Sequence, residues 1–367
     1  MEKDVTESGQ LAGGGEPFGE DDLQAVSELE KARDQIVGEL SKVVVGQQEV
    51  IEQLLISIFA RGHCLLVGVP GLAKTLLIRT LASALSLRFN RIQFTPDLMP
   101  ADITGTEVIQ EDRGTGQREY RFLPGPIFAN VILADEINRT PPKTQAALLE
   151  AMQEHQVTAG GERHRLAEPF FVLATQNPLE LEGTYPLPEA QLDRFMFHVQ
   201  VDYPSEDEEL EIVLRTTADH EPVVEATLNA EQIIHLTRIV RKIPVAEHVA
   251  RYALRLARQT RHNQPDAADF VKQYVMWGAG PRASQYLVLG AKARAALSGR
   301  LYASSDDVKA IAAPVLRHRI KTTYSADAEG ITPDEIIRQV IAATPIHVDD
   351  EAHRGRVTQV FRPADTR

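Results

Sequence analysis

The residues best suited to chemistry begin with Lys74 and Thr75, which follow a loop of mostly small residues. Residues 68–75 read GVPGLAKT and lie between an apolar run and an apolar helical pattern. In a strand–loop–helix arrangement of this kind, backbone N–H groups and the positive end of the helix point toward phosphate. We therefore expect Lys74 to reach the β- and γ-phosphates of a nucleotide and Thr75 to bind Mg²⁺.

The loop departs from the usual phosphate-binding pattern at Ala73, because glycine normally precedes the lysine. Alanine is the smallest replacement, but it permits fewer backbone dihedrals than glycine. Taken alone, the stretch could also be an ordinary turn between a strand and a helix. The residues predicted to contact the nucleotide here are Gly68, Pro70, Gly71, Leu72, Ala73, Lys74, Thr75 and Leu76.

Two carboxylates, Asp135 and Glu136, directly follow the apolar run at 131–134. A short apolar run of this type predicts a strand buried on both faces of a parallel sheet, and the carboxyl end of such a strand lies at the ligand edge. There Asp135 would hold Mg²⁺ through water, and Glu136 would orient or deprotonate an attacking water. The alternative is a strand that merely ends in a charged turn.

Asn177 follows a second buried-strand pattern at 170–175. At the same sheet edge, its amide could hydrogen-bond a γ-phosphate or the attacking water. Asparagine before a proline, here Pro178, is also common in simple turns, so the motif by itself leaves both interpretations open.

The elements that must position these residues fall into an α/β core and a helical second part. We predict a central parallel sheet flanked by helices over residues 22–203, followed by a smaller all-α domain over 204–345. The core carries two predicted hairpins, with tips at 113–116 and 159–161. Residues 1–21 are polar and rich in glycine, which predicts disorder, and 346–367 are predicted to be a loose tail.

Composition limits the class of protein. The chain has 367 residues, 43% of them hydrophobic, and a formal net charge of −13, so nucleic-acid binding driven by bulk electrostatics is disfavoured. The single cysteine, Cys64, excludes an internal disulfide framework and fits a reducing cytosol. No apolar run is long enough to span a bilayer, and the N-terminal residues lack the apolar segment of a signal peptide. These features predict a cytoplasmic protein.

Five motifs in a fixed order make the chain similar to the MoxR family of AAA+ ATPases over about residues 41–344. They are GVPGLAKT at 68–75, ADEINR at 134–139, ATQNP at 174–178, EAQLDRF at 189–195 and GPRAS at 280–284. Ala73 is typical of this family. The two hairpins resemble inserts that the family shares with magnesium-chelatase motor subunits and MCM helicases.

The resemblance implies a role for each motif. It makes Lys74 and Thr75 the Walker A pair, Asp135 and Glu136 the Walker B pair, and Asn177 sensor 1. It further assigns Arg194 as the arginine finger, Arg282 as sensor 2, and Val45, Gly46 and Gln47 as the segment beside adenine. An arginine finger acts on the nucleotide of a neighbouring subunit, so a ring, usually a hexamer, is implied.

Structural alternatives remain open for three of these assignments. Arg194 could form a surface ion pair with Asp193 or Glu189, Arg282 could simply be a helix-start arginine, and the valines near residue 45 could be core packing. The basic stretch 317–321 reads as the charged end of a helix, with a nucleic-acid patch as the less favoured interpretation. The histidines lack the spacing of a transition-metal site.

The leading functional hypothesis is a Mg²⁺-dependent ATPase that remodels or assembles a protein client. By resemblance, it would work with a separate partner that carries a von Willebrand factor A domain. The alternatives are a metal-chelatase-type motor subunit, a nucleotide-dependent scaffold with little hydrolysis, and, least favoured because of the net charge, a DNA motor.

Overall fold

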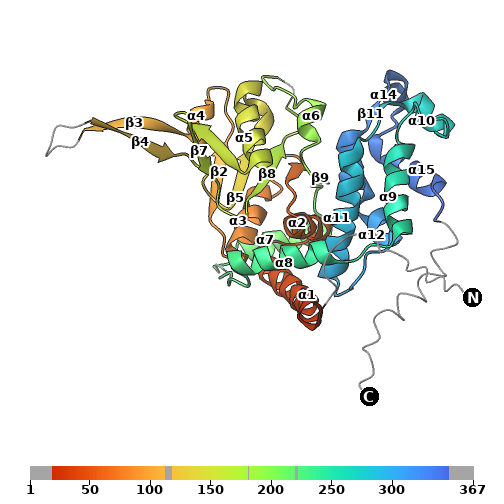
Figure 1. Ribbon diagram of the computed structural model, residues 1–367, viewed down its shortest axis with the longest axis horizontal. Helices are drawn as coiled ribbons and strands as arrows, with labels where there is room; N and C mark the ends of the chain where they lie inside the picture. Colours follow the sequence, from red (N-terminus) through yellow and green to blue (C-terminus); the bar gives the residue numbers. More distant parts are fainter. Residues whose placement is uncertain (1–18, 112–117, 181, 220–221, 347–367) are drawn as a thin grey trace, which may run out of the picture.

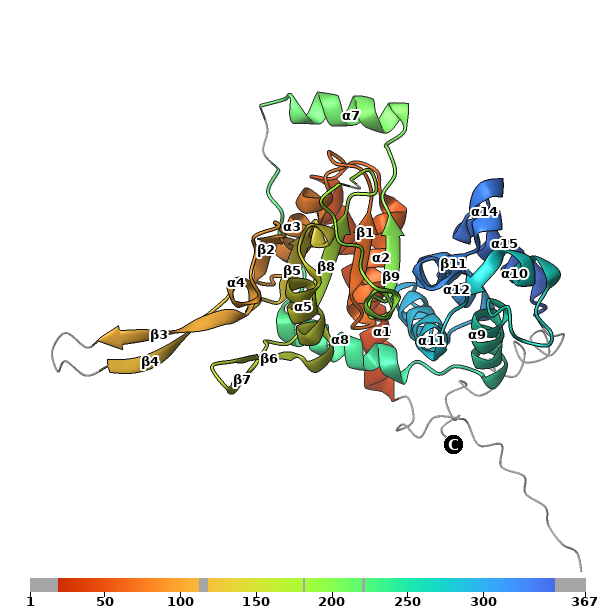
Figure 2. The same ribbon diagram turned by 90° about the horizontal axis from the view of Figure 1, so that it is seen from above.

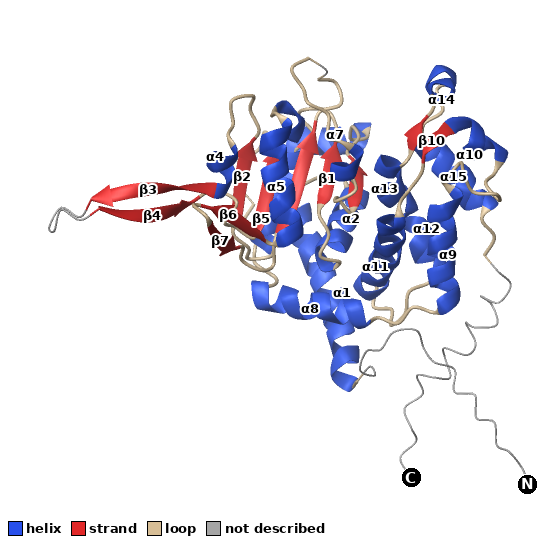
Figure 3. Ribbon diagram, turned by 45° about the horizontal axis from the view of Figure 1, so that its top comes forward, coloured by secondary structure: helices blue, strands red, loops and turns tan. Residues whose placement is uncertain are grey.

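The centre of the molecule is a five-stranded parallel sheet with strand order β2-β5-β8-β1-β9. A computed structural model describes residues 19–111, 118–180, 182–219 and 222–346. Figure 3 shows the sheet with helices packed around it. The strands are β1 (Cys64–Val67), β2 (Phe89–Gln93), β5 (Val131–Asp135), β8 (Phe171–Gln176) and β9 (Phe197–Gln200). The predicted parallel sheet is confirmed.

Helices cover both faces of this sheet because successive strand residues point to opposite sides. Cys64 and Leu66 join an apolar cluster that includes three helices of the core, whereas Leu65 joins a cluster that includes a fourth. The first three are α1 (Glu20–Ser41), α2 (Gln48–Phe59) and α3 (Lys74–Ala84), and the fourth is α5 (Pro142–Glu154). Burial on both faces explains why the strands read as continuous apolar runs.

Both predicted hairpins are present. After α4 (Pro100–Thr104), β3 (Gly105–Glu111) pairs with β4 (Arg118–Pro124), and Figure 2 shows this hairpin extending well beyond the core. Its predicted tip, 113–116, lies outside the described residues. The second hairpin joins β6 (Gln156–Ala159) to β7 (Glu162–Arg165). The rings of Phe122 and His164 stack at 3.8 Å and connect the two hairpins.

The second part of the chain is helical apart from one short ribbon. Its helices are α7 (Glu206–Thr216), α8 (Ala230–Lys242), α9 (Glu247–Gln259), α10 (Asp269–Tyr274), α11 (Pro281–Leu297), α12 (Ser305–Ala310), α13 (Ala312–Leu316), α14 (Tyr324–Glu329) and α15 (Pro333–Ala343). The ribbon pairs β10 (Val275–Trp277) with β11 (Lys321–Thr322), and these strands are too short for a period-two pattern to reveal. Figure 1 shows the helices from α9 onward beside the core, whereas α8 lies along the core itself.

Helix α8 packs against α1 and α2 of the core as well as against α11. The core and the helical part therefore share one apolar cluster. The proposed boundary at residue 203 stays a prediction.

The chain ends differ slightly from expectation. Helix α1 begins at Glu20, so residues 20–21 are helical, whereas the sequence predicts disorder there. Residues 1–18 and 347–367, where the rest of that segment and the tail were predicted, lie outside the described residues. Among the described helices, none has the length and apolarity needed to cross a bilayer.

Candidate nucleotide site

The loop between β1 and α3 has the geometry predicted from its small residues. Gly71 has a φ of +88°, and Ala73 adopts the left-handed conformation with φ +54° and ψ +21°. An L-residue in this conformation costs about 1 kcal/mol relative to glycine. Gly68 is needed for a different reason, because a Cβ there would lie 2.5 Å from the carbonyl oxygen of Val201.

The Lys74 side chain curls into its own loop. Its Nζ donates hydrogen bonds to the carbonyl oxygens of Gly68 at 2.6 Å and Val69 at 2.8 Å. Burial lowers the pKa of this ammonium, while the nearby charges of Asp135 and Glu136 oppose that shift. The cation therefore lies in the concave loop within the electrostatic reach of both carboxylates, where an anionic phosphate could exchange for the two carbonyl oxygens.

Sheet order brings Asp135 and Asn177 to the same edge as this loop. Strand β8 lies between β5 and β1, with Ala134 opposite Ala174 and Val67 opposite Gln176. All three strands are parallel, so the residues at their carboxyl ends converge. The predicted juxtaposition is observed, although the catalytic roles of these residues stay predictions.

Thr175, which the sequence motifs do not mark as a site residue, links the two predicted carboxylates. Its Oγ1 donates to Asp135 Oδ1 at 2.5 Å and accepts from the Glu136 backbone N–H at 2.9 Å. The signal that could have identified Thr175 is its place at the end of a buried-strand pattern, two residues before Asn177. The contact itself depends on β8 lying next to β5, which the sequence did not reveal.

Asp135 retains room for a water ligand of Mg²⁺. Arg91 donates to Oδ2 through Nε at 3.0 Å and Nη2 at 2.6 Å, and Thr175 donates to Oδ1. A carboxylate offers about four acceptor positions, so these three bonds leave one on Oδ1. The donor set therefore fits a hydrated magnesium ion.

Glu136 is held by one of its two carboxylate oxygens. Its backbone is left-handed, with φ +57°, and Oε2 accepts from Gln93 Nε2 at 2.7 Å and pairs with Arg139 Nε at 3.3 Å. Among the described residues, no partner is found for Oε1. This oxygen is therefore available to accept a proton from water.

Asn177 has the turn geometry weighed as its alternative role. Its Oδ1 accepts from the Leu179 backbone N–H at 3.1 Å. Hydrogen bonds from Arg139 and then from the Asn177 side chain lower the pKa of Glu180. An amide NH₂ group has two donors, so a phosphate contact remains available alongside this turn.

We expect Thr175→Val to weaken magnesium-dependent turnover about 10–100-fold, the usual cost of removing a hydrogen bond that orients a metal-binding carboxylate. A Mg²⁺ titration of ATPase activity measures the effect. Thr158→Val, on the exposed hairpin strand β6, is the matched control. A Thr175→Val protein with the wild-type magnesium response would contradict the assignment.

A cavity of about 290 Å³ lies next to the loop, at the predicted adenine segment. Val45 and Gln47 line one part, and Gln47 Nε2 donates to the Leu72 carbonyl oxygen at 3.1 Å, which ties this segment to the phosphate loop. Lining residues not predicted from sequence include Gln200, Asp202, Tyr203, Glu208 and Arg317. The size suits a nucleobase.

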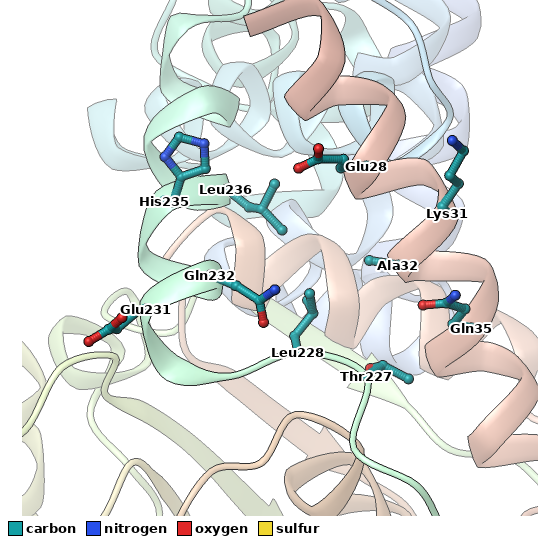
Figure 4. A pocket seen from close by; sticks show the side chains of 10 residues that line it. All are labelled: Glu28, Lys31, Ala32, Gln35, Thr227, Leu228, Glu231, Gln232, His235 and Leu236. Atoms are coloured by element: carbon teal, nitrogen blue, oxygen red, sulfur yellow. The ribbon is translucent and has the colours of Figure 1, made fainter. Parts of the chain in front are cut away.

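A larger cavity, about 460 Å³, lies between α1 and α8 (Figure 4). Glu28, Lys31 and His235 are among the residues that line it. None of the predicted site residues lines this cavity. Val45 and Gln47, both predicted beside adenine, line the smaller one, which is therefore favoured as the functional cavity.

Arg194 and Arg282 lie at the end of the sheet where the strands begin, whereas Lys74 lies at the end where they finish. Strand β9 runs parallel to β1 with Phe197 opposite Cys64; Arg194 precedes β9, whereas Lys74 follows β1. A four-residue strand spans about 13 Å, so this arginine is far from its own phosphate loop. Arg282 Nη1 pairs with Asp193 at 2.9 Å beside it.

The ion pairs considered as alternatives for Arg194 do not form. Glu189 pairs with Lys321 at 2.5 Å, and Asp193 pairs with Arg282 and Arg319. The Arg194 side chain is half-buried and has no ion pair with the described residues. It is therefore available to a second chain.

Arg319 differs most from its sequence interpretation. The sequence predicts Arg319 at the charged end of a helix, yet only 6% of it is exposed, and it lies between the core and the helical part. It binds the Asp193 carboxylate at 2.7 Å and donates to the carbonyl oxygens of Asp193 and Phe195, each at 2.7 Å. This burial rules Arg319 out of the nucleic-acid patch considered at 317–321.

We expect Arg319→Met to lower the free energy of unfolding by about 3 kcal/mol, because it leaves buried acceptors without a partner. Urea denaturation followed by circular dichroism measures the change. Arg251→Met is the control, since Arg251 forms an exposed pair with Glu247 on α9. Equal midpoints for both variants would contradict this role.

Comparisons with known proteins agree with this geometry. Residues 63–197 match the ATPase family associated with various cellular activities (AAA), and residues 267–340 match the AAA lid domain. Chaperone MoxR1 of Mycobacterium tuberculosis is 42% identical, over 89% of this chain and 84% of that protein. The chain belongs to the MoxR family of AAA+ ATPases.

Other relatives are also similar to this chain over most of its length. Protein MoxR of Paracoccus denitrificans is 31% identical, over 84% of this chain and 94% of that protein. A crystal structure from Cytophaga hutchinsonii is 41% identical, with a TM-score of 0.81 over 88% of this chain and 97% of that one. The P-loop core followed by a helical lid is thus confirmed, and the lid, predicted to be all-α, also contains the short β10–β11 ribbon.

Proposed function

We propose that this MoxR-family chain hydrolyses ATP with Mg²⁺ and uses the energy to remodel or assemble a protein client. The observation that carries the proposal is the convergence of Lys74, Asp135 and Glu136 at one sheet edge, beside a cavity of about 290 Å³. The family assignment supports ATPase chemistry and a chaperone-like role.

In the proposed reaction each residue acts on a different part of the nucleotide. Lys74 and the loop N–H groups bind the phosphates, and Thr75 and Asp135 would hold the metal. Bound Mg²⁺ would supply positive charge against the β- and γ-phosphate oxygens. Glu136 accepts a proton from the attacking water through its Oε1, and Asn177 orients that water or the γ-phosphate.

The proposal requires a ring, with six subunits as the expected number. Arg194 lies at the edge away from its own loop, so it would neutralise developing phosphate charge in the next subunit. Arg282, paired with Asp193 beside it, shares this edge. It would therefore serve the same neighbouring site.

The client and the partner are proposed from the family resemblance. In this proposal the two hairpins contact the client, and a separate protein with a von Willebrand factor A domain would direct the work. A cytosolic location is proposed from cysteine use: Cys64 is buried, and burial raises the pKa of its thiol to about 12.

The test compares ATP turnover in three samples: the purified chain with Mg²⁺, the same chain with EDTA, and the Lys74→Ala variant with Mg²⁺. We expect turnover only for the first, and loss of nucleotide binding in Lys74→Ala. A chain indifferent to magnesium, or active without Lys74, would overturn the proposal.

A further inference from the structure

Arg139 bridges two carboxylates at the nucleotide edge of the sheet, and the proposed reaction gives it no role. It ends the short 3₁₀ helix Ile137–Arg139, which directly follows Glu136. Its Nε donates to Glu180 Oε2 at 2.7 Å, and its Nη2 lies 2.6 Å from the same oxygen. Its Nε also lies 3.3 Å from Glu136 Oε2. One guanidinium is therefore shared between Glu180 and the proposed base.

Arg139 is bound more closely by Glu180 than by Glu136. The hydrogen bond with Glu180 raises the pKa of Arg139, burial opposes that shift, and the charge of Glu136 contributes less than either. The distances agree with this order, because charge-assisted N–H···O bonds are about 2.7–2.9 Å long. Glu180 thus holds the guanidinium, and Glu136 only attracts it.

This unequal sharing keeps the proposed base available. The Glu136 carboxylate uses Oε2 for its contacts with both Gln93 and Arg139, while Oε1 has no partner among the described residues. A guanidinium presents a fork of donors that fits both oxygens of one carboxylate. Without Glu180, Arg139 would turn fully to Glu136 and donate to Oε1, the oxygen that must accept a proton from water.

The turn of Arg139 onto the base requires only side-chain rotation. Arg139 lies three residues after Glu136, and residues at this spacing share one side of a helical turn. The Arg139 side chain is 39% exposed, so it has room to move. The competing carboxylate is therefore what determines where this guanidinium lies.

Glu180 is itself held by a second donor. Hydrogen bonds from Arg139 and, to a smaller extent, from the Asn177 side chain lower the pKa of Glu180. Asn177 and Glu180 lie at and after the carboxyl end of β8, whereas Glu136 and Arg139 follow the neighbouring strand β5. The contact therefore ties together two strand ends that border the proposed nucleotide site.

We propose that Glu180 is a positioning residue for ATP hydrolysis, and that it acts by competing with Glu136 for Arg139. The inference rests on the proposed function, because it takes Glu136 as the base. Glu180 itself touches neither the nucleotide nor the attacking water. Its carboxylate keeps Arg139 away from Oε1, so that the base need not break an ion pair before each turnover.

The first test is a double-variant cycle that measures steady-state phosphate release with Mg²⁺ over a range of ATP concentrations. We expect Glu180→Ala to lower kcat about 10–100-fold with KM unchanged, because a bidentate charge-assisted pair must break before Glu136 can act. Arg139→Ala, alone or combined with Glu180→Ala, should keep kcat within about threefold of the wild type, because no guanidinium is then left to block the base.

Two results would overturn the inference. One is a wild-type kcat in Glu180→Ala. The other is a double variant as slow as Glu180→Ala, because a residue needed only for folding is not rescued by a second deletion. Glu247→Ala, Arg251→Ala and their combination are the matched control, since these residues form an exposed ion pair on α9, and each should change kcat less than about twofold.

The second test does not depend on turnover. A crystal structure of Glu180→Ala should show Arg139 donating to both carboxylate oxygens of Glu136, and an Arg139 side chain that stays away from Oε1 would contradict the inference. Magnesium-dependent hydrolysis by the wild type, with no rescue of Glu180→Ala, would refute only the role of Glu180. Unaltered hydrolysis in Glu136→Gln would refute the proposed base, and this inference with it.

Discussion

Replacing Glu136 by glutamine should slow ATP hydrolysis about 10²–10⁴-fold while leaving ATP binding unchanged, because the amide cannot accept the proton of the attacking water. Glutamine keeps the shape of the side chain and can still bond to Gln93, so the loop should stay folded. Steady-state phosphate release and a fluorescent-nucleotide titration separate the two effects.

The control for this prediction is Glu154→Gln, at the exposed end of α5. An unchanged hydrolysis rate in Glu136→Gln would show that another group is the base. If the rate falls as expected, the variant holds ATP and serves as bait. Affinity capture with it, compared with Lys74→Ala, should then identify the client.

Arg194→Ala should lower turnover by about 10³-fold with nucleotide binding retained, the typical cost of removing an arginine supplied by a neighbouring subunit. The reason is positional, since Arg194 lies one strand length from its own phosphate loop. Arg251→Ala provides a control for loss of an exposed arginine. The measurement is the ATPase rate above the assembly concentration.

A mixing experiment tests whether the arginine acts across subunits. Arg194→Ala and Lys74→Ala are each expected to be inactive, but in a mixed ring an intact loop can meet an intact arginine. Random mixing at equal amounts restores about a quarter of the interfaces, so activity should reappear to about that extent. Mixtures as inactive as their components would contradict action in trans.

Much of this site could be predicted because its residues follow short apolar strands. The runs that end at Asp135 and Thr175 identify buried parallel strands, and residues after such strands must meet at one edge. The predicted Lys74, Asp135 and Asn177 are brought together for this reason. The roles of Arg194 and Arg282 were predicted from the order of the five family motifs, because the residues around each arginine do not indicate a role by themselves.

The remaining contacts depend on which strands and helices become neighbours. Arg91 lies on β2 and reaches Asp135 only because β2 pairs with β5. Arg319 lies more than 120 residues from Asp193 in sequence. Because its sequence neighbours in 317–321 are mostly basic, the sequence predicts an exposed side chain. Ribbon β10–β11 has too few residues for alternation to show.

The buried position of Arg319 has a mechanical consequence. One guanidinium binds Asp193, Phe195 and Met196 on the core side and the Val315 carbonyl oxygen on the lid side. The lid cannot rotate without displacing the segment that holds Arg194. In the proposed ring, each subunit would then signal its own closure to the next one by advancing or withdrawing that arginine, so turnover would pass sequentially from subunit to subunit.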